Sequence, residues 1–80
     1  MSRKTLQRKP EQIDWAEVGR RIRQLRGFDL TQEDFASRIG VSQSYLSAIE
    51  HGRNEIGAGV LLAISRTCGK SMEWLLTGEG

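Results

Sequence analysis

Four residues between positions 43 and 48 are spaced to share one face of a helix, and none of them is charged: Gln43, Ser44, Ser47 and Ala48. Glutamine can form two hydrogen bonds with an adenine edge, serine can donate to or accept from base edges, and alanine can touch a thymine methyl group. A carboxylate here would be repelled by phosphates, and long lysines would add affinity without base identity. The face is therefore predicted to contact base edges in the major groove, whereas the alternative is a solvated face of low charge.

Further polar residues near this face are candidates for phosphate contacts. Gln32 opens the preceding helical pattern, and the free N–H groups at a helix start favour phosphate. From there Gln32 is also expected to brace Gln43. The candidates are Gln32, Tyr45, His51, Arg53 and Asn54. The alternatives are a surface glutamine, a solvated loop at positions 53 and 54, and a histidine that complements the helix dipole.

The sequence disfavours an enzyme, a metalloprotein and a membrane protein. Cys68 is the only cysteine and His51 the only histidine, so no disulfide, zinc pair or nucleophile–base pair is indicated. We expect no cofactor, no metal and no small-molecule ligand. No apolar run reaches the ~18 residues of a membrane span, and no apolar segment follows the basic N-terminus as it would in a secretion signal. These features predict a cytoplasmic protein.

The positive charge is concentrated at the beginning of the chain. Residues 1–26 hold eight basic and three acidic residues, net +5, whereas residues 27–80 hold four basic and seven acidic residues, net −3. Such asymmetry favours a polyanionic partner. Residues 1–12 are predicted to form a flexible arm that contacts DNA through Arg3, Lys4, Arg8 and Lys9, and the alternative is a solubilising tail.

Helix start and stop signals recur along residues 13–78. Asp14, Thr31, Ser42 and Ser71 are typical N-cap residues, and Gly27, Gly40 and Gly52 are typical stop residues. Glu17 is placed to complete a capping box with Asp14. The fourth helix is expected from about 57 or 58 to 67. Because no strand-like alternation is present, the prediction is an all-α fold, a compact bundle of five short helices.

Apolar residues at helical spacing predict the buried side of each helix. The expected core residues are Val18, Ile22, Leu25, Phe35, Ala36, Ile39, Leu46, Ile49, Val60, Leu61, Ile64, Cys68, Trp74 and Leu75. The second and third helices are joined only by Gly40, Val41 and Ser42. A connection of this length that contains glycine makes two helices cross steeply, which is the geometry of a DNA-binding helix-turn-helix.

With these residues in place, the chain resembles the lambda-type phage repressor family, also called the Xre or Cro/C1 family. The segments "LTQEDFA", "SYLSAIEHGR" and "SMEWLLTGEG" match the family pattern, and the similarity covers about residues 14–78. The resemblance implies a lambda repressor-like fold and a sequence-specific transcriptional regulator, most often a repressor. It also implies a bacterial or phage-encoded, nucleoid-associated protein.

The resemblance also assigns roles to particular residues. Gln43 and Ser44 open the recognition helix and would read bases, and Ser47 and Ala48 would face the groove one turn later. Gln32 would contact phosphate and support Gln43. In addition, Arg26 near the end of the first helix would form a structural ion pair with Glu50.

Relatives bind inverted-repeat operators as dimers, so the resemblance implies a homodimer on double-stranded DNA. The C-terminal helix would supply the interface through Met72, Trp74, Leu75 and Leu76, with ordinary core packing as the alternative. The alternative function is a protein-interaction module or an antitoxin-type subunit with the same fold. Two segments depart from the family pattern: "RGFDLTQ" is one residue shorter than in many relatives, and "IGAGVLL" has two glycines near a helix start.

Overall fold

The computed structural model describes residues 11–80, which form five helices and no strand. The helices are α1 (Trp15–Arg26), α2 (Gln32–Ile39), α3 (Gln43–Glu50), α4 (Ala58–Cys68) and α5 (Met72–Thr77). The predicted all-α fold is confirmed. The basic residues proposed for the arm, Arg3, Lys4, Arg8 and Lys9, lie outside the described residues.

Four of the five helices begin at the predicted cap residues. The side-chain oxygens of Asp14, Thr31, Ser42 and Ser71 accept hydrogen bonds from backbone N–H groups in the first turns of α1, α2, α3 and α5. Such bonds satisfy N–H groups that have no partner within the helix. In contrast, the residue that precedes α4 is Gly57, which has no side chain to cap the helix. The carboxylate of Glu17 pairs with Arg20 at 3.2 Å, on the outer surface of α1, and not with the cap as the capping box predicted.

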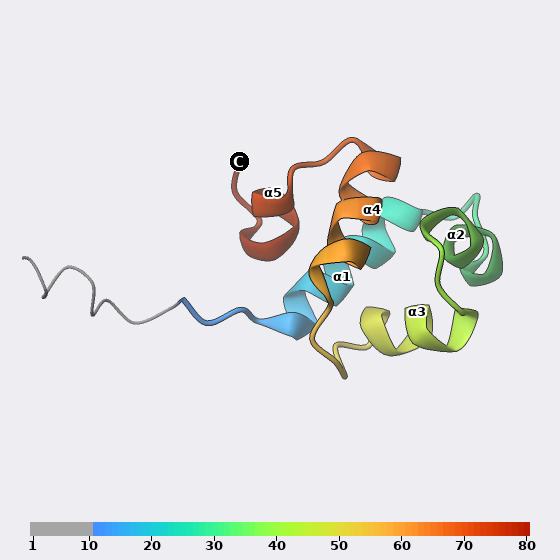
Figure 1. Cartoon of the computed structure of the whole chain (residues 1–80), viewed down its shortest axis with the longest axis horizontal. Coiled ribbons are helices and arrows are strands. Elements are labelled where there is room, and N and C mark those ends of the chain that lie inside the picture. The colour runs from blue at the N-terminus through green and yellow to red at the C-terminus, as the bar shows by residue number, and fades with distance from the viewer. Residues whose placement is uncertain (1–10) are drawn as a thin grey trace, which may run out of the picture.

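The helices are arranged around α1. It packs against α3 and α5, while α2 packs against α3 and α4, and α4 packs against α5. Figure 1 shows α1 and α4 through the middle of the molecule, α2 and α3 at one end, and α5 with the C-terminus at the other. The helix-turn-helix and the C-terminal helix therefore lie on opposite sides of one core.

The core takes residues from all five helices and from the α3–α4 loop. The buried apolar residues are Val18, Ile22, Phe35, Ala36, Ile39, Leu46, Ile49, Ile56, Leu61, Ile64 and Leu75. Leu25, Val60 and Trp74, which were expected to face inward, are half-buried and pack against this cluster. Cys68 does the same, and its burial raises the pKa of the thiol, which favours the neutral form at neutral pH.

Two glycines allow α1 and α3 to approach with their backbones in contact. A Cβ atom on Gly19 would lie 2.2 Å from the carbonyl oxygen of Ile49. A Cβ atom on Gly52, which has φ +71°, would lie 2.6 Å from the Cα of Ala16. Because neither position has room for a side chain, the C-terminal end of α3 is held directly on α1.

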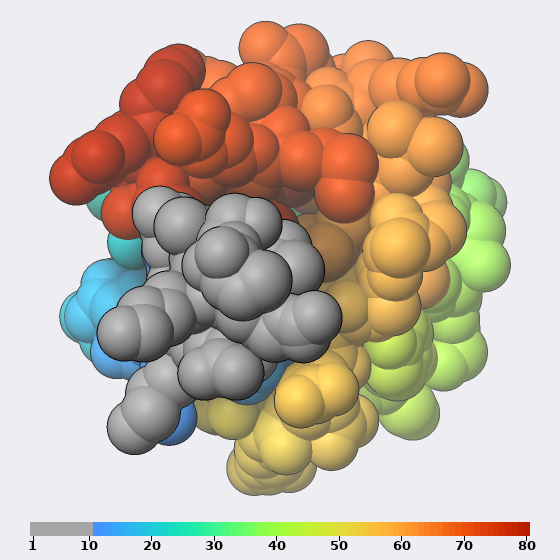
Figure 2. All heavy atoms as spheres, turned by 60° about the vertical axis from the view of Figure 1, so that its left-hand side comes forward, coloured from blue at the N-terminus to red at the C-terminus, as the bar shows by residue number. Residues whose placement is uncertain are grey.

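A single arginine joins α1 to the last helix. The Nη1 of Arg21 donates a hydrogen bond to the carbonyl oxygen of Leu75 at 3.0 Å, which satisfies a carbonyl group near the end of α5. The guanidinium also lies against Gly78. Figure 2 shows α4 and α5 side by side along the upper part of the surface, with the segment that follows α3 along the lower part.

Candidate nucleic-acid interface

The turn between α2 and α3 is closed by glycine geometry. Gly40 adopts the left-handed conformation with φ +79° and ψ +30°, and the N–H of Val41 donates to the carbonyl oxygen of Ala36 at 2.9 Å. This bond ends α2 and redirects the chain within three residues. As a result α3 crosses α2 at the edge of the molecule, with one face on the core and the other directed outward (Figure 1).

The four predicted base-contacting residues lie together on the outer face of α3. They line one open hollow with a residue from α2 and one from the α3–α4 loop: Gln32, Gln43, Ser44, Ser47, Ala48 and Arg53. Gln43 and Ser44 are exposed, whereas Ser47 and Ala48 are half-buried in the floor.

The chemistry of this hollow suits a polyanion that also presents hydrogen-bonding groups, as the base edges of DNA do. No carboxylate lines it, so a phosphate would meet no like charge within it. Gln43, Ser44 and Ser47 supply neutral donors and acceptors, Ala48 supplies a methyl group, and Arg53 supplies a cation at one side. Neutral side chains that both donate and accept are the groups that distinguish base pairs in the major groove.

A hydrogen-bonded cluster behind the hollow fixes the end of α3. The Nε and Nη2 of Arg26 donate to the two carboxylate oxygens of Glu50 at 2.7 and 3.0 Å. The Nη1 of Arg26 donates to the carbonyl oxygen of Leu30 at 3.0 Å. Glu50 is only 8% exposed, so a two-point ion pair connects α1, α3 and the loop before α2.

Gln32 takes part in the same cluster, in a way that the sequence did not indicate. Its Nε2 donates to Oε1 of Glu50 at 3.0 Å, where the expectation was a contact with Gln43. An amide nitrogen carries two N–H donors, so one is used within the protein and the second remains for a ligand. Gln32 therefore belongs both to the buried ion pair and to the hollow.

The charges of this cluster are mutually stabilised. Burial raises the pKa of Glu50, but the hydrogen bonds from Arg26 and Gln32, with the positive charges of Arg26 and Arg23, outweigh burial and hold the pKa below its usual value. The hydrogen bond to Glu50 raises the pKa of Arg26. The carboxylate is therefore ionised and paired at neutral pH.

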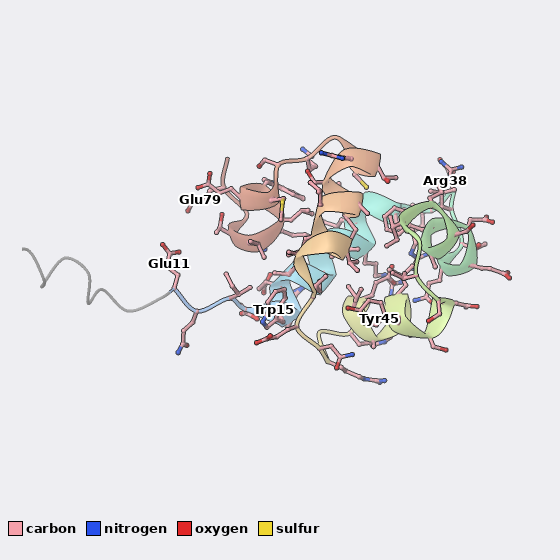
Figure 3. All side chains as sticks on the ribbon, in the orientation of Figure 1. Glu11, Trp15, Arg38, Tyr45 and Glu79 are labelled. Atoms are coloured by element: carbon pink, nitrogen blue, oxygen red, sulfur yellow. The ribbon has the colours of Figure 1, made fainter. Side chains whose placement is uncertain are left out.

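The remaining phosphate candidates are more scattered. Arg53 lines the hollow, whereas Tyr45, His51 and Asn54 do not. Tyr45 is half-buried on α3, which lies below Arg38 of α2 in the view of Figure 3. The Nδ1 of His51 lies 2.8 Å from the carbonyl oxygen of Ser47, so this ring closes the last turn of α3. Asn54 is exposed in the following loop.

The four residues expected at a dimer interface differ in exposure. Leu75 is fully buried in the core of its own chain, so its side chain is not available to a partner. Met72, Trp74 and Leu76 are half-buried and keep part of their surface accessible. Lys70 covers the Trp74 ring at 4.8 Å from the ring centre. The candidate dimer surface therefore narrows to Met72, Trp74 and Leu76.

Residues 11–80 lack the features of two other classes of site. This part of the chain has no group of three or more His, Cys, Asp or Glu side chains placed to hold a metal ion. None of its helices has the length and apolar character needed to cross a membrane.

Comparison with protein families and relatives gives one consistent result. A family model described as "Helix-turn-helix" matches residues 20–75. An uncharacterized transcriptional regulator from the ATPase CF(0) region of Rhodospirillum rubrum is 38% identical over 63 residues, 78% of this chain and 58% of that protein. An uncharacterized HTH-type transcriptional regulator of Sinorhizobium fredii is 42% identical over 60 residues, 74% of this chain and 41% of that protein.

Solved structures show the same similarity in three dimensions. The P22 c2 repressor, crystallised with a synthetic operator, superposes on this chain with a TM-score of 0.73 at 30% sequence identity. The match covers 86% of this chain and all of that one. Among the curated relatives compared, the chain spans between 14% and 58% of their length.

Proposed function

The chain belongs to the helix-turn-helix family, and on that basis we propose that it is a sequence-specific DNA-binding transcriptional regulator whose α3 enters the major groove. The observation that carries this proposal is the acid-free hollow, which gathers Gln43, Ser44, Ser47 and Ala48 with Gln32 and Arg53. The relatives named as transcriptional regulators, and the repressor crystallised with a synthetic operator, support the same function.

Within this function the residues divide into two groups. Gln43, Ser44, Ser47 and Ala48 contact base edges, because they are uncharged and lie on the outer face of α3. The phosphate contacts are Gln32, Tyr45, His51, Arg53 and Asn54, with Arg3, Lys4, Arg8 and Lys9 of the N-terminal arm following the backbone. The second N–H of Gln32 is the donor best placed for this role, since Glu50 fixes the first.

The proposed regulator is a homodimeric repressor in the cytoplasm, bacterial or phage-encoded and associated with the nucleoid. A single α3 covers only a half-site, so two copies on an inverted repeat supply the affinity that one lacks. The partly exposed apolar residues of α5, Met72, Trp74 and Leu76, form the contact between the copies. We propose that the protein is not an enzyme, because the polar groups of the α3 hollow suit base recognition.

Selection of bound duplexes from a random-sequence pool, at two salt concentrations, tests this function. The wild type should enrich an inverted repeat, and the enrichment should persist at the higher salt because base contacts are not screened as phosphate contacts are. Gln43→Ala and Ser44→Ala should lose that enrichment. Ser37→Ala, on the exposed side of α2 away from the hollow, is the matched control and should enrich the wild-type motif.

The contrary result is equally definite. Weak retention of all sequences, lost at the higher salt, would mean that α3 does not read bases. The fold would then serve the alternative function, a protein-interaction module or an antitoxin-type subunit. A mass that remains monomeric both in solution and on the selected duplex would contradict the dimer alone.

A further inference from the structure

A second hollow lies on the C-terminal half of α1, outside the face that carries α3. Its lining residues are Arg20, Arg23, Gln24, Arg26, Gly27 and Phe28. Phe28 is the unusual member: at 107% relative exposure its ring is completely in solvent. The hollow therefore places one apolar ring beside several guanidinium groups, a combination that can contact both apolar and anionic parts of a ligand.

The three arginines of this hollow are not equally neutralised. Arg20 pairs with the exposed carboxylate of Glu17, and Arg26 pairs with the buried carboxylate of Glu50. Arg23 is exposed and has no ion-pair partner within the described part of the chain. Cations in the last turn complement the helix dipole, which accounts for Arg23 and Arg26 but for neither Arg20 nor Phe28.

This second hollow is linked to the hollow on α3 through the buried carboxylate of Glu50. Arg26 lines the first and binds Glu50, and Glu50 binds Gln32, which lines the other. The two hollows are therefore linked by one ion pair, Arg26–Glu50, and one hydrogen bond from the side-chain amide of Gln32 to Glu50. Each DNA strand carries one phosphate per about 3.4 Å of helix axis, so a strand held at Gln32 continues beyond it with further phosphates.

We propose that the hollow on α1 binds the sugar–phosphate backbone of DNA flanking the sequence that α3 reads, with Arg23 on a phosphate and Phe28 against a deoxyribose. This inference rests on the proposed function and extends it from base reading to the length of duplex that the protein covers. It also assigns a use to an uncompensated guanidinium and to an exposed ring that the base-reading face leaves unexplained.

The DNA backbone fits the hollow better than an acidic peptide does. A guanidinium presents a planar set of N–H donors that matches phosphate oxygens. The backbone alternates such anionic groups with apolar sugar faces, as the hollow places Arg23 near Phe28. The connection through Arg26 to the α3 hollow would have no function for a separate protein ligand.

The test uses the duplex enriched in the selection described above, with flanks on both sides of the motif. Neutral methylphosphonates replace the phosphates just outside the motif in one version of the duplex. Affinity is measured over a salt series for the wild type, Arg23→Gln and Phe28→Ala. Arg66→Gln on α4 is the matched control, since it removes the same charge from an exposed position that lines neither hollow.

Arg23→Gln should weaken binding about tenfold, as expected for a charged hydrogen bond. It should also lower the slope of log affinity against log salt by about 0.9, the value for one lost phosphate contact. Methylphosphonates should weaken the wild type more than they weaken Arg23→Gln, because the variant has already lost one of the contacts that they remove. Phe28→Ala should weaken binding several-fold, roughly as for a lost apolar contact, with the salt slope unchanged.

Equal methylphosphonate penalties in the wild type and Arg23→Gln, with equal salt slopes, would overturn the inference while the proposed function stands. The hollow would then be assigned to an acidic protein segment. If the wild type enriches no motif, the proposed function fails. The salt slopes of wild type and Arg23→Gln on a mixed-sequence duplex then decide the hollow separately, because backbone contacts do not depend on base sequence.

Discussion

The two ends of α3 are built in opposite ways. At its C-terminal end, Glu50 is buried in a two-point ion pair and Gly52 lies against the backbone of Ala16. At its N-terminal end, Gln43 and Ser44 are exposed, and the protein holds the helix there through the Ser42 cap and the turn from α2. One end is fixed to the rest of the domain, and the other presents its side chains to solvent.

This difference shows how a small domain combines rigidity with readable chemistry. A side chain that reads a base must be free to bond to a ligand, so it adds little to the folded state. Its position must then be set elsewhere on the same helix. Substitutions at the fixed end should therefore change stability, and substitutions at the open end should change DNA binding alone.

The largest loss of stability is expected from removing the Glu50 carboxylate at the C-terminal end of α3. Glu50→Ala leaves the guanidinium of Arg26 and the amide of Gln32 without their buried partner. Loss of one member of a buried pair should lower the free energy of unfolding by about 3 kcal/mol or more. Chemical denaturation measures this, with exposed Glu55→Ala as control. An unchanged midpoint for Glu50→Ala would remove the ion pair from the account of stability.

A smaller loss should follow from crowding the same end. Gly19→Ala places a methyl carbon against the carbonyl oxygen of Ile49 and forces α1 and α3 apart. Overpacking of this kind costs about 1–3 kcal/mol. Gly59→Ala is the matched control, because a Cβ there meets nothing within 4 Å and should stabilise α4 by up to about 1 kcal/mol. If both variants shift the unfolding midpoint in the same direction, close backbone contact is not what limits Gly19.

Substitutions at the exposed N-terminal end of α3 should change the affinity for DNA and leave the stability of the fold unchanged. Gln43→Ala should weaken binding to the selected duplex by about 1–3 kcal/mol, the range for one bidentate base contact, and should relax the preference at one position of each half-site. Its melting temperature should match that of the wild type. Gln12→Ala, exposed before α1, is the control for both measurements. A lower melting temperature for Gln43→Ala would show that the two ends are not separable.

The smallest expected effect is on the way the melting temperature changes as the pH is lowered. The pKa of Glu50 is lower in the folded protein than its ordinary value, about 4.3. The pair therefore contributes its full stability above that value and loses it as the pH falls through the lower folded-state pKa. Melting temperatures between neutral pH and pH about 3 should fall less steeply for Glu50→Gln than for the wild type. Exposed Glu33→Gln should retain the wild-type slope, and parallel slopes for all three proteins would contradict the assignment.

Local signals in the sequence were sufficient for the elements but not for their contacts. Four cap residues and the glycine that ends α2 predicted where helices start and stop, because caps act within a few residues of the chain. The pair between Arg26 and Glu50 came from family resemblance. Leu75 was expected both in the core and at a dimer interface, and its full burial agrees with the first of these expectations.

The features that sequence reasoning missed all depend on distances between separate helices. Nothing near Gln32 in the sequence indicates that its amide binds Glu50, since the two are 18 positions apart. The contact of Gly19 with Ile49 is equally long-range, and a lone glycine within a helical pattern is ambiguous. Phe28 would be taken as a core residue from its type alone. It is exposed in the short α1–α2 connection, directly after Gly27, whose φ is +70°.

The contact between α1 and α3 is made largely of backbone, and this has a consequence for how such proteins diversify. A carbonyl oxygen resting on a glycine does not depend on which side chains occupy the outer face of α3. Positions 43, 44 and 47 can therefore mutate, or be replaced together by transplanting a helix face from a relative, while the scaffold persists. A few substitutions on the outer face of α3 should therefore change the DNA sequence that the domain binds and leave its fold intact.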